Sequence, residues 1–227
     1  MTTVVLSGSL GSTAMMWDPQ RAVLSGFEVV DVEHPGHGDA PVGDGRTIDA
    51  LAARVLAAVD GPFSFVGLSL GGALGMRIAA DHPERVERLV LACTAAQFGD
   101  PLQWRERAAT VRAEGLEVIA DAILARWFTP SFGSVEPYRR MLVSIDQEGY
   151  ARCCEALAGW TGEGIERIQA PTLVVAGADD PTVTPEVAAE LSERIPGARL
   201  AVLDDAAHLA NVERPDEFNR LLEEHLR

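Results

Sequence analysis

The sequence contains no lysine: all 19 of its basic residues are arginines, and they face 34 acidic residues, which gives a net charge of −15. The absence of lysine excludes active sites built on a P-loop lysine, a Schiff-base lysine or a Ser-Lys dyad. The acidic balance argues against nucleic acid as a partner, because such binding needs clustered positive charge. An anionic substrate would meet an unfavourable long-range field and would need arginines placed locally in its site.

Long apolar runs and a basic N-terminal segment are also missing. No apolar stretch approaches the roughly 20 residues of a membrane span, and the first six residues carry no basic group of a signal peptide. Cys93, Cys153 and Cys154 have no metal-binding spacing, and the two adjacent ones make a poor disulfide pair. We therefore expect a protein of the reducing cytoplasm that does not bind membranes.

The chain does contain a regular alternation of short apolar runs and amphipathic segments. Strands are predicted at residues 4–6, 27–32, 63–66, 88–93, 171–177 and 198–203, and helices at 47–59, 73–80, 185–195 and 215–226. Near-continuous apolar strands between amphipathic helices predict an α/β fold with a parallel sheet covered on both faces. Residues 97–168 interrupt this pattern with helical periodicity alone. We therefore predict a core of residues 1–96 and 169–227, and a helical cap, or lid, of residues 97–168 above the carboxyl ends of the strands.

Residues 67–72 read Gly-Leu-Ser-Leu-Gly-Gly between a predicted strand and a predicted helix. A Gly-x-Ser-x-Gly motif in that context is typical of a nucleophile elbow, in which glycines two residues either side of the serine allow a very tight turn. Ser69 is therefore the candidate nucleophile. The oxyanion hole is predicted from the backbone N–H groups of Leu70 and Leu10, the latter in a Gly/Ser-rich loop that otherwise reads as a simple turn.

A serine nucleophile needs a histidine base, which follows it in the chain of elbow enzymes. Three histidines lie downstream of Ser69. His82 reads as a surface residue at a helix end, and His225 as a positive charge that suits the C-terminal end of the last helix. His208 lies in a loop after the last predicted strand, where sites assemble, and is the candidate base.

The carboxylate that orients the base should follow the penultimate strand, and both Asp179 and Asp180 do so. The sequence pattern alone does not separate the two. Asp204 and Asp205 lie too close to His208 in sequence and read as solvated turn residues.

His34 and His37 form the one spacing that suggests a metal. With no third ligand nearby in sequence, the segment 34–38 reads as a structural turn, and we expect no metal and no other cofactor.

These residues together resemble the α/β-hydrolase superfamily and, more closely, the 3-oxoadipate enol-lactonases of the β-ketoadipate pathway of aromatic catabolism. The resemblance runs over nearly the whole chain. It is carried by the Ser-Gly-Ser-Leu-Gly loop at 7–11 with Met-Trp-Asp-Pro-Gln at 16–20, by residues 83–91, by Arg-Trp-Phe-Thr-Pro at 126–130, and by Gly-Tyr-Ala-Arg-Cys-Cys at 149–154. The resemblance implies that Asp180, three residues after Gly177, is the acid.

Two features depart from that family. Its members usually begin with a hairpin of about twenty residues, whereas this sequence starts directly at the first parallel strand, so we expect about six strands rather than eight. Gly8 stands where the family has an asparagine in the oxyanion loop, which affects how the substrate would be positioned.

The resemblance implies a serine hydrolase that opens a small carboxylated lactone, namely 3-oxoadipate enol-lactone to 3-oxoadipate, through an acyl-enzyme. Arg126 beside Trp127 in the cap would bind the substrate carboxylate, although Arg126 reads equally well as an ordinary solvated arginine. The alternatives are a general carboxylesterase or another lactonase, an acyltransferase, and a weakly catalytic sensor of small molecules. The expected partner is a small ester or lactone, and the sequence leaves open whether the chain forms a homo-oligomer.

Overall fold

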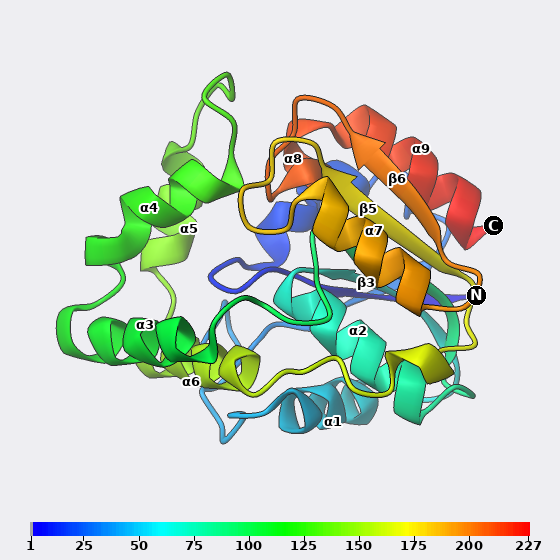
Figure 1. The fold of residues 1–227 in the computed structure, drawn as a ribbon, viewed down its shortest axis with the longest axis horizontal. Coiled ribbons are helices and arrows are strands. Elements are labelled where there is room, and N and C mark those ends of the chain that lie inside the picture. Colours follow the sequence, from blue (N-terminus) through cyan, green and yellow to red (C-terminus); the bar gives the residue numbers. More distant parts are fainter. Residues whose placement is uncertain (1) are drawn as a thin grey trace.

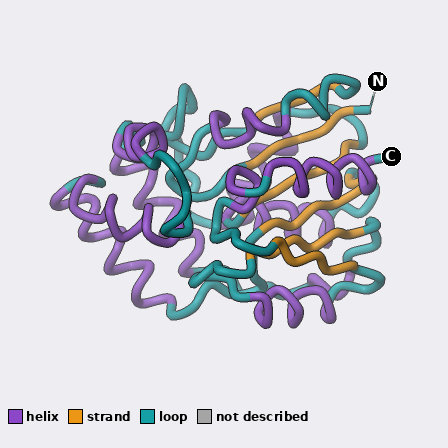
Figure 2. The backbone as a smooth tube through the Cα atoms, turned by 90° about the horizontal axis from the view of Figure 1, so that it is seen from above, coloured by secondary structure: helices purple, strands orange, loops and turns teal. Residues whose placement is uncertain are grey.

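A wholly parallel sheet of six strands forms the centre of the structure, a computed structural model that describes residues 2–227 (Figures 1 and 2). The strands are β1 (Thr3–Ser7), β2 (Glu28–Asp31), β3 (Phe63–Leu68), β4 (Val86–Ala92), β5 (Thr172–Gly177) and β6 (Arg199–Leu203). They pair in the order β2-β1-β3-β4-β5-β6. The predicted α/β fold with about six parallel strands is confirmed. The central strands β3 and β5 are buried at every residue, which explains why the sequence shows them as unbroken apolar runs.

Helices cover both faces of the sheet. They are η1 (Ala14–Gln20), α1 (Ile48–Ala58), α2 (Leu70–Asp81), η2 (Ile165–Arg167), α7 (Pro185–Arg194), α8 (Ala210–Glu213) and α9 (Pro215–Leu226). Helix α9 packs on β4 beside η1. On the opposite face, α2 packs on β3 and β4, and α1 packs on α2 (Figure 1). Thr47 is the N-cap residue of α1, since its side chain accepts the N–H of Ala50 in the first turn.

One expectation about a helix end is wrong. The ring of His225, near the end of α9, is buried, and its Nε2–H is shared between the carbonyl oxygens of Leu89 and Pro171, both at 3.1 Å. Burial lowers the pKa of this histidine, so the ring is a neutral packing group rather than a positive charge at the helix terminus.

Four α-helices lie between β4 and η2 in the chain: α3 (Pro101–Glu114), α4 (Glu117–Trp127), α5 (Glu136–Val143) and α6 (Gln147–Ala158). They gather at the left of Figure 1, beside the end of the sheet where the strands finish. We call residues 97–168 the cap. Its buried side chains belong to the same hydrophobic cluster as those of the sheet, so the cap and the core share one continuous interior.

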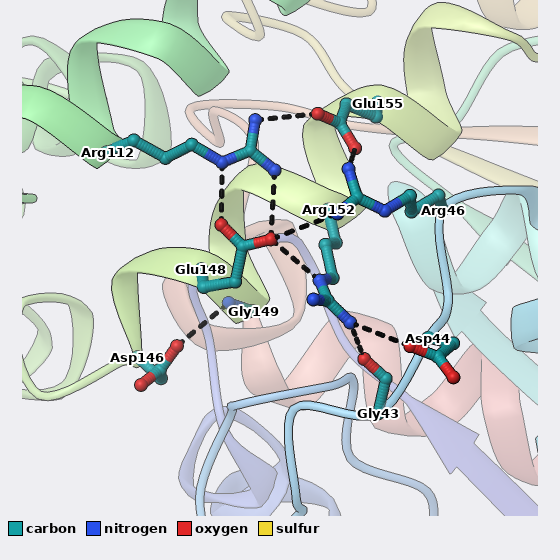
Figure 3. Close-up of polar contacts among 9 residues, drawn as sticks. All are labelled: Gly43, Asp44, Arg46, Arg112, Asp146, Glu148, Gly149, Arg152 and Glu155. Atoms are coloured by element: carbon teal, nitrogen blue, oxygen red, sulfur yellow. Dashed lines mark hydrogen bonds and ion pairs between the residues drawn. The ribbon is translucent and has the colours of Figure 1, made fainter.

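A network of ion pairs also fastens the cap to the core (Figure 3). Arg112 of α3 lies 2.6 Å from both Glu148 and Glu155 of α6, and Arg46, in the loop before α1, lies 2.7 Å from Glu155. Arg112 and Arg152 together lower the pKa of Glu148 to about 2. Each exposed pair contributes only about 0.2–1 kcal/mol, so the network holds the helices in register while burial supplies most of the stability.

Among residues 2–227, no helix is both long enough and apolar enough to cross a membrane.

Candidate active site

The turn between β3 and α2 places Ser69 at the carboxyl end of the sheet. Its backbone lies at φ 57° and ψ −113°, a region that a non-glycine residue rarely adopts. The strained turn is held by the Ser69 N–H, which donates to Ala92 O at 2.9 Å, and by the Thr94 hydroxyl, which donates to Ser69 O at 2.7 Å. The expected need for two flanking glycines is confirmed, since a Cβ on Gly67 would collide with the backbone of Gly71, and one on Gly71 with the carbonyl of Ser7.

His208 and Asp180 meet in the loops that follow β6 and β5. Nδ1 of His208 lies 2.7 Å from Oδ2 of Asp180, and both side chains are buried. The other oxygen of Asp180, Oδ1, accepts the N–H groups of Thr182 at 2.8 Å and Val183 at 3.1 Å. Both oxygens of this carboxylate therefore accept from fixed donors, and the ring of His208 is held with Nδ1 toward Asp180 and Nε2 directed away from it.

The structure separates the two aspartates that the sequence leaves as alternatives. Asp179 is exposed, whereas Asp180 is 2% exposed and contacts His208. Asp204 and Asp205 are both exposed, and Asp205 pairs with Arg214 rather than with the histidine. Of these four carboxylates, Asp180 alone has the hydrogen bond that a partner of His208 requires.

The loop after β1 lies against the first turn of α2. The N–H of Gly71 donates to the carbonyl of Gly8 at 3.1 Å, and Leu10 lines the same cavity as Ser69. Within residues 2–227, the N–H groups of Leu10 and Leu70 have no hydrogen-bond partner. Two unpaired donors beside a serine, one of them at a helix N-terminus, are suited to bind a developing oxyanion.

His34 and His37 hold this loop in place, a role that sequence reasoning did not find. Nε2 of His34 donates to Gly8 O at 2.8 Å, and Nε2 of His37 accepts the N–H of Gly11 at 2.9 Å while its Nδ1–H donates to Pro35 O at 2.9 Å. The two rings thus hold the loop by hydrogen bonds at Gly8 and Gly11, on either side of Leu10. The segment is a structural turn, as the sequence indicates, but one that shapes the candidate oxyanion hole.

His37 must be neutral for its Nε2 to accept a hydrogen bond, and burial lowers the pKa of both rings, of His34 to about 4 and of His37 to about 3, so both are neutral near pH 7. The unfolded chain binds protons at these rings below about pH 6.5 whereas the folded chain does not, so stability is lost as the pH falls from about 6.5 toward 4. We expect the free energy of unfolding in urea to be lower at pH 5.5 than at pH 7.5 by about 1.4 kcal/mol for each histidine.

The matched variants are His37→Gln, which removes one titrating ring, and His82→Gln, whose exposed ring does not touch the loop. The first should reduce the difference between the two pH values by the contribution of one ring, about 1.4 kcal/mol, and the second should retain the full difference. Equal stability of the wild type at pH 5.5 and 7.5 would contradict the assignment of two neutral buried rings.

A cavity of about 270 Å³ brings these groups together. Its floor includes Ser69 and His208, and its remaining wall comes largely from the cap. The lining residues from the cap are Gln97, Phe98, Gly99, Gln103, Trp104, Arg107, Ile123, Arg126, Trp127 and Tyr150. This volume is just below the usual range of about 300–1,000 Å³ for small-ligand sites, so the cavity fits a compact molecule.

Two arginines face the cavity. Arg126 and Trp127, the residues that the sequence suggests, both line it, with Arg126 exposed and the Trp127 side chain buried. Arg107 lines it as well, with its guanidinium 4.6 Å from the ring centroid of Trp104. Neither arginine forms an ion pair in the part of the chain that the structure describes. Sequence reasoning missed Arg107 because α3 carries several arginines and its weakly amphipathic pattern does not show which face is covered.

The known proteins that this chain is similar to are hydrolases, in agreement with the geometry of the site. The model of the alpha/beta hydrolase family matches residues 4–221. The 3-oxoadipate enol-lactonase 2 of Acinetobacter baylyi is 39% identical over 97% of this chain and 86% of its own length.

Solved structures are similar over the full length. The enol-lactonase from Burkholderia xenovorans LB400 has 40% identity and a TM-score of 0.95, covering 99% of this chain and 91% of that one. A thermophilic esterase from Thermogutta terrifontis, solved with malate bound, has 27% identity and a TM-score of 0.91, covering 100% and 90%. Because the family model spans residues 4–221 and the Acinetobacter relative is 39% identical over nearly the whole chain, this protein belongs to the alpha/beta hydrolase family.

Proposed function

We propose that the protein is a serine hydrolase that opens a small carboxylated lactone, 3-oxoadipate enol-lactone, to give 3-oxoadipate. The observation that carries the proposal is one small cavity that contains a strained elbow serine, a histidine bonded to a buried aspartate, and two arginines without carboxylate partners. The first three groups serve acyl transfer, and the arginines suit an anionic acyl group. The names of the Acinetobacter and Burkholderia relatives support this substrate.

In the proposed reaction, Ser69 Oγ attacks the lactone carbonyl while its proton passes to Nε2 of His208. The N–H groups of Leu10 and Leu70 bind the oxyanion of the tetrahedral intermediate. The intermediate collapses with cleavage of the ring C–O bond, and the leaving oxygen takes the proton from His208 to form an enol, which tautomerises to the ketone.

Deacylation repeats these steps with water as the nucleophile. Water attacks the acyl-enzyme as it gives a proton to His208, and Ser69 leaves with that proton. Asp180 keeps the histidine in the tautomer with hydrogen on Nδ1 and stabilises the imidazolium that forms in each half-reaction. No step of this scheme needs a metal or an organic cofactor.

The arginines provide the sharpest test of the substrate class. We expect the wild type to cleave 3-oxoadipate enol-lactone generated in situ, followed by its loss of ultraviolet absorbance. Arg126→Gln and Arg107→Gln should each raise KM for this anionic lactone by about 10-fold or more, because a hydrogen bond to a charged group contributes about 1.5–3 kcal/mol. Both variants should hydrolyse neutral p-nitrophenyl acetate within about threefold of the wild type, since that ester has no carboxylate to bind.

Arg105→Gln is the matched control, because Arg105 lies on the same helix as Arg107 but is exposed and outside the cavity. Equal effects of the three substitutions on both substrates would contradict an anion-binding role. Cleavage of the neutral ester alone, with no turnover of the enol-lactone, would favour a general carboxylesterase. That alternative is supported by the similarity to the Thermogutta esterase.

We also propose that the enzyme works in the cytoplasm. All three cysteines are free and buried. Burial raises the pKa of each thiol, which keeps the sulfur in its unreactive protonated form. This arrangement suits a reducing compartment.

A further inference from the structure

Glu213, at the end of α8, links the cap to the loop of His208. Its Oε1 accepts both the N–H of Thr129 at 2.9 Å and the Thr129 hydroxyl at 2.7 Å. Its Oε2 accepts the N–H of Ala207 at 2.6 Å. Thr129 lies in the cap just after α4, and Ala207 directly precedes His208, so one carboxylate spans two segments that are 78 residues apart in sequence (207 − 129).

Two backbone hydrogen bonds join the same two segments, and we call this contact between the end of α4 and the His208 loop the junction. The N–H of His208 donates to Arg126 O at 3.3 Å, and the N–H of Leu209 donates to Trp127 O at 3.0 Å. The end of α4 and the histidine loop therefore lie side by side, and Arg126 and Trp127 also line the cavity. Hydrogen bonds therefore tie this end of the cap to the backbone that carries His208.

We propose that Glu213 is a positioning residue that couples the cap to His208, so that the base is placed for reaction only while the cap is seated. The inference rests on the proposed function, because it assigns Glu213 a role through the histidine base. Asp180 fixes the ring of His208, and Glu213 fixes the backbone just before it. Charge-assisted hydrogen bonds are short and about twice as strong as neutral ones, which suits a carboxylate for this task.

The carboxylate is required because both of its oxygens accept. In Glu213→Gln the side chain keeps its size but presents one oxygen and one NH₂ group. The oxygen can accept from either Thr129 or Ala207, but the NH₂ group then faces the backbone N–H of the other residue, which is also a donor. The hydrogen bond to that backbone N–H is therefore lost.

We expect Glu213→Gln to lower kcat for p-nitrophenyl acetate by about 10- to 100-fold, with KM within about threefold, since a misplacement near 1 Å costs about 10²-fold. Thr129→Val keeps the backbone N–H and removes only the hydroxyl, so its loss should be smaller, about two- to fivefold. The matched control is Glu193→Gln, an exposed glutamate outside the junction, which should behave as wild type.

Two further measurements separate positioning from loss of fold. The unfolding temperature shows whether Glu213→Gln is folded at the assay temperature, and the proton resonance of His208 Nδ1–H reports its bond to Asp180. The proposal expects a folded variant whose Ser69 reacts with an organophosphate about 10-fold or more slowly than in the wild type, and whose His208 resonance is shifted or broadened.

If Glu213→Gln kept the wild-type kcat and organophosphate reactivity, the inference would be overturned and the proposed function would stand. The same conclusion would follow if the variant had a lower unfolding temperature but an unchanged kcat in the folded protein. A wild type that neither hydrolyses esters nor reacts with the organophosphate would overturn the proposed function and the inference with it.

Discussion

Replacement of Ser69 by alanine is expected to lower kcat by at least about 10⁴-fold for both the enol-lactone and p-nitrophenyl acetate, because the attacking oxygen is lost. A loss near 2 × 10⁶-fold is known for the nucleophilic serine of one serine protease, where binding and the oxyanion hole provide the remaining rate. The oxyanion donors of Leu10 and Leu70 stay in place in this variant. We therefore expect slow residual hydrolysis with KM close to the wild-type value.

The substitution should leave the fold intact. The bonds that hold the elbow come from the backbone of Ser69 and from Thr94, and alanine keeps them. The Ser69 hydroxyl itself makes no hydrogen bond with another described residue. The unfolding temperature should therefore change by no more than about 2 °C, in line with a substitution that removes no structural contact.

Mass spectrometry supplies the decisive control. An organophosphate should add one adduct to the wild type and none to Ser69→Ala, whereas Ser192→Ala, which changes a serine of α7 that does not line the cavity, should be labelled normally. Activity above a few per cent of wild type in the Ser69 variant, or an adduct on another residue, would remove Ser69 from the proposed mechanism.

The order of strands and helices could be predicted from sequence because each element carries its own periodicity. Strands β3 and β5 are buried at every position, so their apolar runs are unbroken. Two short elements escaped prediction for physical reasons. The 3₁₀ helix η1 contains Pro19 and has no period of 3.6 residues, and α8 has four residues, too few for an amphipathic pattern to show.

The residues of the candidate site also fall into two groups, those that local sequence or chain order identifies and those that only the folded structure brings together. The elbow at Ser69 is local, because its glycines lie two residues away, and His208 follows from chain order. The bonds of Glu213 to Thr129 and of His37 to Gly11 join residues 84 and 26 positions apart. Such contacts depend on how the cap and the loops pack, and no spacing rule in the sequence anticipates them.

The choice between Asp179 and Asp180 depends both on the local sequence and on the folded conformation of the loop. Asp179 and Asp180 are adjacent, both follow β5, and both are chemically able to orient a histidine. They differ in direction: the Asp180 side chain turns inward to the N–H groups of Thr182 and Val183 and to His208, whereas Asp179 is exposed. Which of the two adjacent side chains points inward therefore decides which aspartate is assigned to His208. That direction is set by the conformation of the folded loop.

Asp180→Asn is expected to lower kcat by about 10⁴-fold, the size of the loss known for the corresponding change in a serine protease. The hydrogen bonds around Asp180 explain why. The N–H groups of Thr182 and Val183 both donate to Oδ1, so the amide oxygen of asparagine will take that position. The amide NH₂ then faces His208 Nδ1, which must accept a hydrogen bond instead of donating one. The ring hydrogen moves to Nε2, and this nitrogen can no longer accept the proton of Ser69.

Asp179→Asn is the matched control, since it makes the same chemical change one residue away on an exposed side chain. It should keep kcat within about twofold, as surface substitutions away from such a network do. Nitrogen NMR of His208 gives a second, independent readout: hydrogen on Nδ1 in the wild type and in Asp179→Asn, and on Nε2 in Asp180→Asn. If Asp180→Asn retained the Nδ1 tautomer and most of its activity while Asp179→Asn lost both, the orienting role would pass to Asp179, and the loop after β5 would have to turn by one residue in the working enzyme.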